Sequence, residues 1–169
     1  MATTYLTRTP SSATNQKTCT LSVWIKRSAI GVRQAIASQT VDGSNSTFIW
    51  FDTNDEIFFK QNSASPGTEY ELRTNRKFRD TSAWYHIVMA IDTTQATNTN
   101  RAKLYVNGVQ ETSFANSTYP SLDLNTRWNS TTPFNIGRSG GSYLFNGLMS
   151  HFHFIDGTAY DATAFGEYD

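Results

Sequence analysis

The sequence predicts an all-β protein, folded as a sandwich of two antiparallel sheets. Aromatic residues make up 14% of the 169 residues and charged residues only 17%, and Ser, Thr and Asn are abundant. Short strands with hydroxyl-rich outer faces have this composition, whereas helices use more Ala, Glu, Leu and Lys. About ten to twelve short segments separated by turn residues fit such a sandwich, with almost no helix. The length predicts one domain over residues 1–169.

The clearest strand covers residues 18–27, TCTLSVWIKR, where apolar and polar residues alternate. Cys19, Leu21, Val23 and Ile25 share one face, so this strand is predicted to be half-buried. Cys19 is interpreted as buried filler and not as a reactive thiol. Further strands are predicted at residues 34–40, 47–51, 56–61, 68–73, 84–92, 133–138 and 145–155.

A tight hairpin is predicted at residues 101–111, RAKLYVNGVQE. Asn107-Gly108 supplies the two positive-φ positions of a type I′ turn between the flanking valines. The same register sets Leu104 opposite Glu111, an unfavourable pair, so a bulge or a frayed end is expected there.

Three segments between strands are predicted from their turn residues. Residues 115–132 form a long loop, and loops of this length in compact domains are often functional or disordered. Residues 161–165, DATAF, make one helical turn capped by Asp161. Residues 138–143, RSGGSY, form a Gly-rich turn, because neither a helix nor a Walker lysine follows.

The charge balance argues against several partners. Fourteen basic and fourteen acidic residues cancel, and no basic run occurs, so neither nucleic acid nor an anionic membrane is expected. No apolar stretch approaches the roughly 18 residues of a membrane span, and the N-terminal segment lacks the apolar centre of a signal peptide. Cys19 is the only cysteine, which excludes an intrachain disulfide and favours folding in a reducing compartment.

Several motifs occur in an order typical of one family. They are RTPSSA (8–13), TLSVWIKRS (20–28), WYHIVMAIDTT (84–94), LYVNGVQ (104–110), FNIGRS (134–139), FNGLMSHFHFIDGTAY (145–160) and FGE (165–167). Together they resemble the laminin G-like domains of the concanavalin A-like jelly-roll superfamily. The most similar variant is found in virion proteins of bacteriophages, marine phages especially.

The resemblance implies a fold and two classes of function. The fold is a jelly roll of two antiparallel sheets. The first function is a non-enzymatic virion module, in a tail fibre or appendage, that attaches to host-surface polysaccharide. The second is a purely structural capsid-decoration or oligomerisation domain without a ligand. Both imply a virion protein assembled in the host cytoplasm, with other virion proteins as partners. By analogy with symmetric fibres, a homo-oligomer is expected, with a trimer as the first guess.

No enzyme is predicted, with a jelly-roll glucanase as the distant alternative. Such glucanases carry an E-x-D-x-E strand, whose carboxylates lie roughly 5 Å apart in retaining hydrolysis. Glu69 and Glu71 share a strand face, but the third acidic position is Arg73. A solvated strand face explains them better. Cys19 has no assignable histidine, and no G-x-S-x-G elbow exists.

Metal binding is left open. His151 and His153 share a strand face, and with a third ligand such a pair binds zinc or nickel. His86 is the only other histidine, so a polar outer face is the preferred interpretation. Calcium remains a candidate cofactor with no ligands assigned, because laminin G-like domains often hold it at a loop rim. The aspartates at strand ends or in loops are Asp52, Asp55, Asp92, Asp123 and Asp156.

Sugar binding needs aromatic faces and a few fixed polar groups. Trp24 is the most informative candidate, because it interrupts the polar face of its strand. Trp84 and Phe154 are assigned to the core, and most aromatics of a sandwich this size are structural. The candidate glycan platform consists of Trp24, Lys26, Trp50, Arg101, Lys103, Tyr105, Tyr119 and Trp128.

Overall fold

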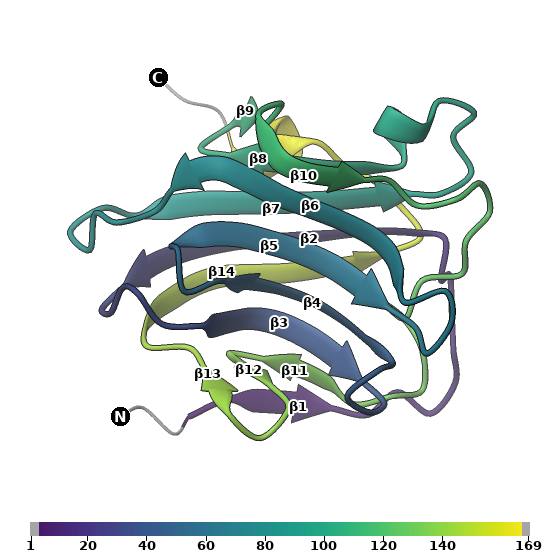
Figure 1. Ribbon diagram of the computed structural model, residues 1–169, viewed down its shortest axis with the longest axis horizontal. Coiled ribbons are helices and arrows are strands. Elements are labelled where there is room, and N and C mark those ends of the chain that lie inside the picture. Colours follow the sequence, from purple (N-terminus) through teal and green to yellow (C-terminus); the bar gives the residue numbers. More distant parts are fainter. Residues whose placement is uncertain (1–3, 167–169) are drawn as a thin grey trace.

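A computed structural model describes residues 4–166 as two stacked antiparallel sheets, which confirms the predicted jelly-roll sandwich (Figure 1). The larger sheet has the order β1-β11-β3-β4-β5-β6-β10 and the smaller β14-β2-β7-β8-β9. The larger sheet contains β1 (Leu6–Arg8), β11 (Phe134–Ile136), β3 (Gln34–Thr40), β4 (Ser46–Phe51), β5 (Glu56–Asn62), β6 (Thr68–Lys77) and β10 (Phe114–Thr118). The smaller sheet contains β14 (Gly147–Asp156), β2 (Thr18–Arg27), β7 (Tyr85–Asp92), β8 (Ala102–Val106) and β9 (Val109–Gln110).

Short elements complete the described chain. A small hairpin joins β12 (Arg138–Ser139) to β13 (Tyr143–Leu144) across the predicted Gly-rich turn. Two 3₁₀ turns are present, η1 (Asn98–Asn100) and η2 (Ala162–Phe165). The Asp161 side chain accepts a hydrogen bond from the Thr163 N–H, so the predicted cap of η2 is confirmed. Within residues 4–166, no helix is long and apolar enough to cross a membrane.

The alternation of apolar residues fills the space between the sheets. Cys19, Leu21, Val23 and Ile25 of β2 are all buried, as predicted. Burial raises the pKa of the Cys19 thiol, and the nearby Asp156 carboxylate adds to the shift. The facing residues from the larger sheet are Ile36, Ala37, Ile49, Phe51, Ile57, Phe59, Tyr70 and Leu72.

The Asn107-Gly108 hairpin forms as predicted. Asn107 has a φ of 49° and Gly108 a φ of 77°, the positive values that a type I′ turn requires. The β8–β9 ladder pairs only two residues on each strand and stops before Glu111. The backbone N–H of Glu111 still donates to the Leu104 carbonyl at 2.8 Å, so a hydrogen bond joins the two strands at this end and the expected fraying is not seen.

Two sequence predictions need correction. Trp84 is 40% exposed and not in the core. Because Ile87 of β7 points into the core, the alternation turns His86 and Trp84 to the opposite face. The predicted loop at residues 115–132 contains most of β10, which pairs with β6. The sequence of β10, FANST, carries almost no apolar alternation, so nothing in it signals a strand.

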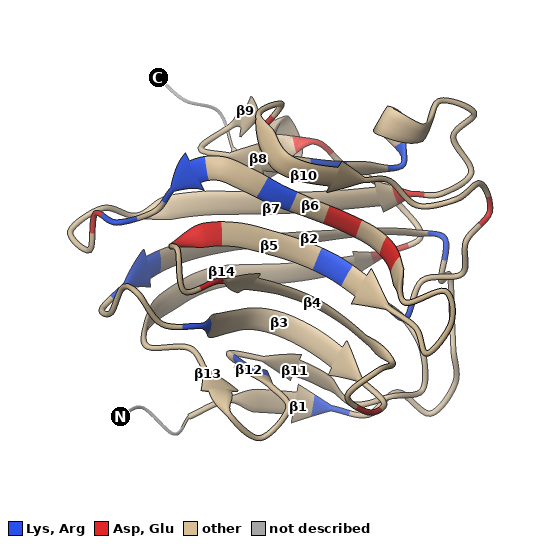
Figure 2. Cartoon of the chain, in the orientation of Figure 1, with Lys and Arg blue, Asp and Glu red and all other residues tan. Residues whose placement is uncertain are grey.

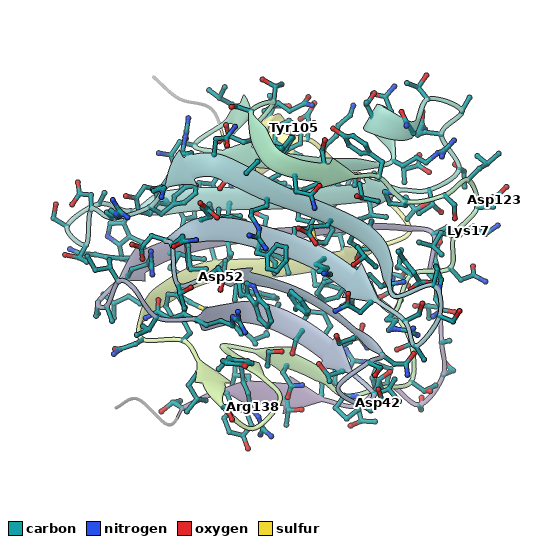
Figure 3. All side chains as sticks on the ribbon, in the orientation of Figure 1. Lys17, Asp42, Asp52, Tyr105, Asp123 and Arg138 are labelled. Atoms are coloured by element: carbon teal, nitrogen blue, oxygen red, sulfur yellow. The ribbon has the colours of Figure 1, made fainter. Side chains whose placement is uncertain are left out.

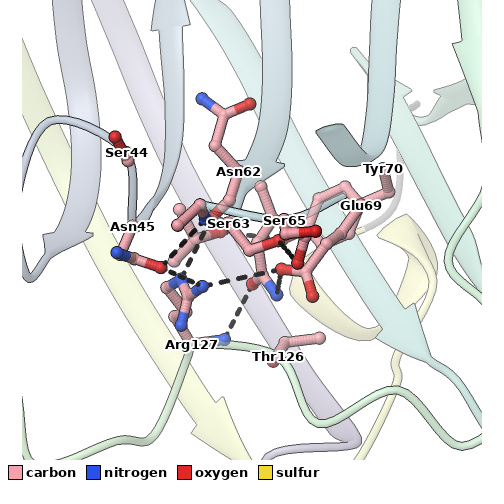
Figure 4. Close-up of polar contacts among 12 residues, drawn as sticks. Ser44, Asn45, Asn62, Ser63, Ser65, Glu69, Tyr70, Thr126 and Arg127 are labelled. Atoms are coloured by element: carbon pink, nitrogen blue, oxygen red, sulfur yellow. Dashed lines mark hydrogen bonds and ion pairs between the residues drawn. The ribbon is translucent and has the colours of Figure 1, made fainter. Parts of the chain in front are cut away.

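The rest of that long loop is fastened to the larger sheet through Arg127 (Figure 4). The Arg127 guanidinium donates to the Asn62 carbonyl at 3.1 Å and to the Asn45 side chain at 3.0 Å. An ion pair of 2.9 Å between Asp123 and Lys17, which precedes β2 and is labelled with Asp123 in Figure 3, attaches the loop at a second point. The loop is therefore part of the scaffold.

A buried ion pair joins the two sheets at one end of the sandwich. Arg27, at the end of β2, lies 3.0 Å from Asp55 in the β4–β5 turn, and both side chains are almost fully buried. Arg27 also donates to the Phe78 carbonyl at 2.6 Å. Asp55 accepts hydrogen bonds from the Gly31 N–H at 2.7 Å and from Arg79 at 3.1 Å. Burial alone raises the Asp55 pKa, but these hydrogen bonds and Arg27 outweigh it and lower the pKa.

Replacement of Asp55 by Asn is expected to destabilise the fold by about 3–5 kcal/mol, because it leaves Arg27 buried without a counter-charge. Urea unfolding at pH 7 measures this cost. The matched control Asp123→Asn breaks the exposed pair with Lys17 and should cost at most about 1 kcal/mol. Because the Asp55 pKa is lowered on folding, its contribution is present above the unfolded value of 3.8 and fades below it. Equal stability of both variants at pH 7 would contradict the assignment.

Candidate functional site

An aromatic cluster lies on the outer face of the larger sheet, away from the core. Phe48, Trp50 and Phe58 pack with Ala35 as a cluster separate from the core between the sheets. Alternation along β4 explains the separation, because its other aromatic and aliphatic residues point inward. The three rings are only 4%, 7% and 6% exposed (Phe48, Trp50 and Phe58), because side chains from neighbouring segments cover them on this outer face. The cluster is therefore a second, smaller apolar core that can serve as the floor of a binding surface.

The rings of this cluster pack closely. Phe48 stacks on Trp50 with centroids 3.7 Å apart and planes 20° from parallel. Phe58 meets Phe48 edge-on at 5.8 Å. Tyr143, at the end of the small β12–β13 hairpin, meets Trp50 edge-on at 5.4 Å. The Gly-rich turn between β12 and β13 allows this, since Gly140 adopts a φ of 57°.

Basic side chains lie over these rings. The Arg33 guanidinium is 4.6 Å from the Trp50 ring and 5.0 Å from the Tyr143 ring, and Asp52 holds it at 2.9 Å. The Arg73 guanidinium is 4.4 Å from the Phe58 ring. Cation–π contacts of this kind fix both the cation and the ring.

Charges of both signs frame the cluster on the neighbouring strands β5 and β6 (Figure 2). Lys60 of β5 pairs with Glu71 of β6 at 3.0 Å, and Arg73 lies 3.8 Å from the same carboxylate. The other Glu71 oxygen accepts a hydrogen bond from Asn116 at 2.8 Å. Two cations and one carboxylate make up this frame, and the carboxylate is already engaged by its neighbours.

The aromatic cluster, together with Arg33, Lys60 and Tyr143, lines a groove of about 440 Å³, called here the aromatic groove. Within residues 4–166, the Trp50 indole N–H is buried without a hydrogen-bond partner. A buried donor without a partner is costly, and functional sites are where such groups are retained. Aromatic faces with fixed donors and acceptors suit a sugar. The main lining residues are Arg33, Phe48, Trp50, Phe58, Lys60 and Tyr143.

The predicted glycan platform does not come together in one place. Trp50 lies in the aromatic groove. Trp24, Lys26, Lys103 and Tyr105 lie on the outer face of the smaller sheet, where Val23, Ile25 and Leu104 alternate with them into the core.

Three further members of the predicted platform serve the scaffold. Trp128 is fully buried and donates to the Tyr70 hydroxyl at 3.1 Å, so its prediction as an exposed platform is wrong. Arg101 donates to the Gln95 and Ala96 carbonyls and closes their loop. Tyr119 is half-buried and packs against the core.

Sequence reasoning missed most of the aromatic groove. Phe48, Phe58, Arg33 and Tyr143 were not among the predicted site residues. The usable signal is the unbroken apolar run at 48–51, FIWF, because a strand that is apolar on both faces needs apolar partners on both.

Several carboxylates considered as catalytic or calcium-binding candidates accept hydrogen bonds from neighbouring residues. Glu69 accepts from Gln61 at 2.9 Å and lies 3.8 Å from Arg127. Asp92 accepts from Thr94 and Gln95, and Asp156 from Asn129. Across the described residues, no group of three or more His, Cys, Asp or Glu side chains is spaced to hold a metal ion. Calcium binding remains an untested prediction.

A two-layer antiparallel sandwich with an external aromatic groove is the architecture of a lectin-type jelly roll. The family model of the concanavalin A-like lectin/glucanases superfamily, in its laminin G type, matches residues 2–162. The chain therefore belongs to this superfamily. A search of curated proteins gave no match.

Solved structures of similar fold come from diverse proteins. Domain 4 of the extracellular arabinanase AbnA of Geobacillus stearothermophilus, in complex with arabinotriose, has 21% identity and a TM-score of 0.61. The alignment covers 88% of this chain and 64% of that domain, so the chain spans less than two thirds of it.

Two more distant structures show the same fold. The CBM40 domain of the Ruminococcus gnavus IT-sialidase, bound to α2,3-sialyllactose, has 12% identity and a TM-score of 0.63, over 88% of this chain and 80% of that one. Domains LG4-5 of the mouse laminin α1 chain have 11% identity and a TM-score of 0.59, over 89% and 38%. At these identities the likeness establishes the fold alone.

Proposed function

We propose that the chain is a non-catalytic carbohydrate-binding module of a bacteriophage virion protein. One observation carries the binding role: the aromatic groove, where Trp50, Phe58 and Tyr143 lie on the solvent side of a sheet. Two of the solved structures of similar fold carry saccharides, arabinotriose and sialyllactose, which supports a sugar as the ligand class.

The groove offers the two kinds of contact that sugars use. The Tyr143 ring is 36% exposed above the buried rings of the cluster, and it can pack against the C–H groups of a pyranose or furanose. Lys60, Asn62 and Thr40 line the same groove and supply polar groups for hydroxyls. The Arg33 guanidinium, which Asp52 holds over the Trp50 ring, lines the same groove and adds a donor for sugar hydroxyls.

A binding role accounts for the carboxylates better than catalysis does. Glycoside hydrolysis needs one carboxyl to give a proton and a second to act as base or nucleophile. Both oxygens of Glu71 have partners within the larger sheet, Asn116 and Lys60. Glu69 is held by Gln61.

The virion assignment rests on the ordered motifs from RTPSSA to FGE and their resemblance to phage virion proteins. The chain meets two requirements of such a protein. Its core is closed by ion pairs and packing, with one buried free cysteine, so folding in a reducing host cytoplasm needs no disulfide. Its proposed partners are other virion proteins and host-surface polysaccharide.

The groove is tested by replacing Tyr143 with Ala, because this side chain is 36% exposed and can be removed without opening the core. Binding to an array of neutral and acidic oligosaccharides is expected for the native chain. The variant should lose about tenfold in affinity for the bound glycans, as one sugar–aromatic contact is removed. Trp50→Ala should abolish binding.

The matched control is Tyr160→Ala, which removes a tyrosine of similar exposure (43%) from the smaller sheet's side. This variant should bind the same glycans as the native chain. Native binding that survives Tyr143→Ala unchanged, or an array without any bound glycan, would overturn the proposal.

A structural role in oligomers is the second candidate. Leu148 of β14 pairs with Lys26 of β2, and Trp84 directly precedes β7, which is the next strand of the smaller sheet. Leu148 is 57% and Trp84 40% exposed. An exposed apolar row of this kind is the sort of surface that a second copy covers.

Light scattering at micromolar concentration measures the oligomer directly. A trimer is expected if this row is a subunit interface, and the double variant Trp84→Ser/Leu148→Ser should then be monomeric. A native monomer would remove the structural candidate and leave the glycan role unaffected.

A further inference from the structure

All three histidines of the chain lie around one groove on the outer face of the smaller sheet. The groove has a volume of about 360 Å³ and lies on the opposite side of the sandwich from the aromatic groove. We call it the histidine groove. Its main lining residues are Ser22, Trp24, His86, His151, His153 and Phe165.

A β-bulge brings His151 into this groove. Ser150 pairs with Trp24 and His153 with Ser22, so two residues of β14 stand opposite one residue of β2. His151 is the extra residue and has a φ of 49°, a left-handed conformation that few side chains adopt readily. Strained residues at bulges often re-aim a side chain at a functional site. The bulge thus places both exposed histidines of β14 on the groove.

The floor of the groove is a fixed aromatic surface. Trp24 stacks on His86 with centroids 4.9 Å apart and planes 13° from parallel. The Ser22 hydroxyl and the His86 Nε2 are hydrogen-bonded at 2.9 Å, which holds the buried imidazole in place. Burial and the neighbouring His153 lower the pKa of His86, which favours its neutral imidazole.

The charged groups around the groove are almost all basic. His151 and His153 come from β14 and Lys26 follows Trp24 along β2. The η2 turn contributes Ala164 and the Phe165 ring, which lies 6.0 Å from His153. No carboxylate of the described residues lines the groove, and Asp80 lies near Lys26 outside it.

We propose that the histidine groove is a second binding site, for a carboxylate-bearing sugar unit, and that it binds this unit when His151 and His153 are protonated. Trp24 offers a half-exposed ring for the sugar, and the two imidazolium groups pair with the carboxylate. A neutral sugar gains nothing from protonation, so pH separates this site from the aromatic groove.

Imidazole NMR signals test the site directly, because the chain has only three histidines. The probes are glucuronate, galacturonate and N-acetylneuraminate, with glucose as the neutral control. At pH 5.5 at least one acidic sugar should shift the His151 and His153 signals and raise their apparent pKa. Binding should be about tenfold or more weaker at pH 7.5, where ordinary histidines are mostly neutral.

Two variants complete the test. His151→Asn keeps a residue that tolerates positive φ, and His153→Gln keeps a polar exposed side chain, so both should fold. Each should lose most of the affinity at pH 5.5, whereas Tyr143→Ala in the aromatic groove should not change it. Absence of any acidic-sugar shift at pH 5.5, or equal affinity at both pH values, would overturn the proposal without affecting the aromatic groove.

Discussion

The buried pair of Arg27 and Asp55 is the contact on which the rest of the structure depends. Arg27 belongs to β2 of the smaller sheet, and Asp55 to the turn between β4 and β5 of the larger. The same turn carries Asp52, which holds Arg33 over the Trp50 ring. One four-residue turn thus sends one carboxylate inward to join the sheets and another outward to shape the aromatic groove. Loss of the counter-charge of Arg27 would therefore destabilise both the contact between the sheets and the aromatic groove.

Local pattern was enough to predict much of the scaffold. Strands β2 and β3 begin and end at the predicted residues, because alternation and turn residues bound them on both sides. The Asn107-Gly108 turn was equally clear, since few dipeptides adopt its backbone angles. β10 could not be found this way, because its place in the sheet comes from pairing with β6 and not from its own residues.

The sites were harder to predict than the strands, since they depend on contacts between distant segments. Trp128, an aromatic residue in a long loop, is predicted as part of the glycan platform. It fills the core instead, where the Tyr70 hydroxyl accepts a hydrogen bond from its N–H. Trp50 and Tyr143 meet only because the β12–β13 hairpin is placed beside β3. His86 and His153 likewise meet only across β2. In these cases the residue type indicates a possible binding role, but the spacing along the sequence does not show which residues lie close together in the fold.

The single cysteine has a practical consequence. Cys19 is 1% exposed between the two sheets, and its raised pKa keeps it as an unreactive thiol in the folded state. A thiol reagent can therefore reach it only when the sandwich opens. The rate at which the reagent modifies Cys19 therefore measures how often the core opens, without any added label. A cysteine engineered elsewhere on the surface would react alone, which gives each outer face a selective point for attaching a probe.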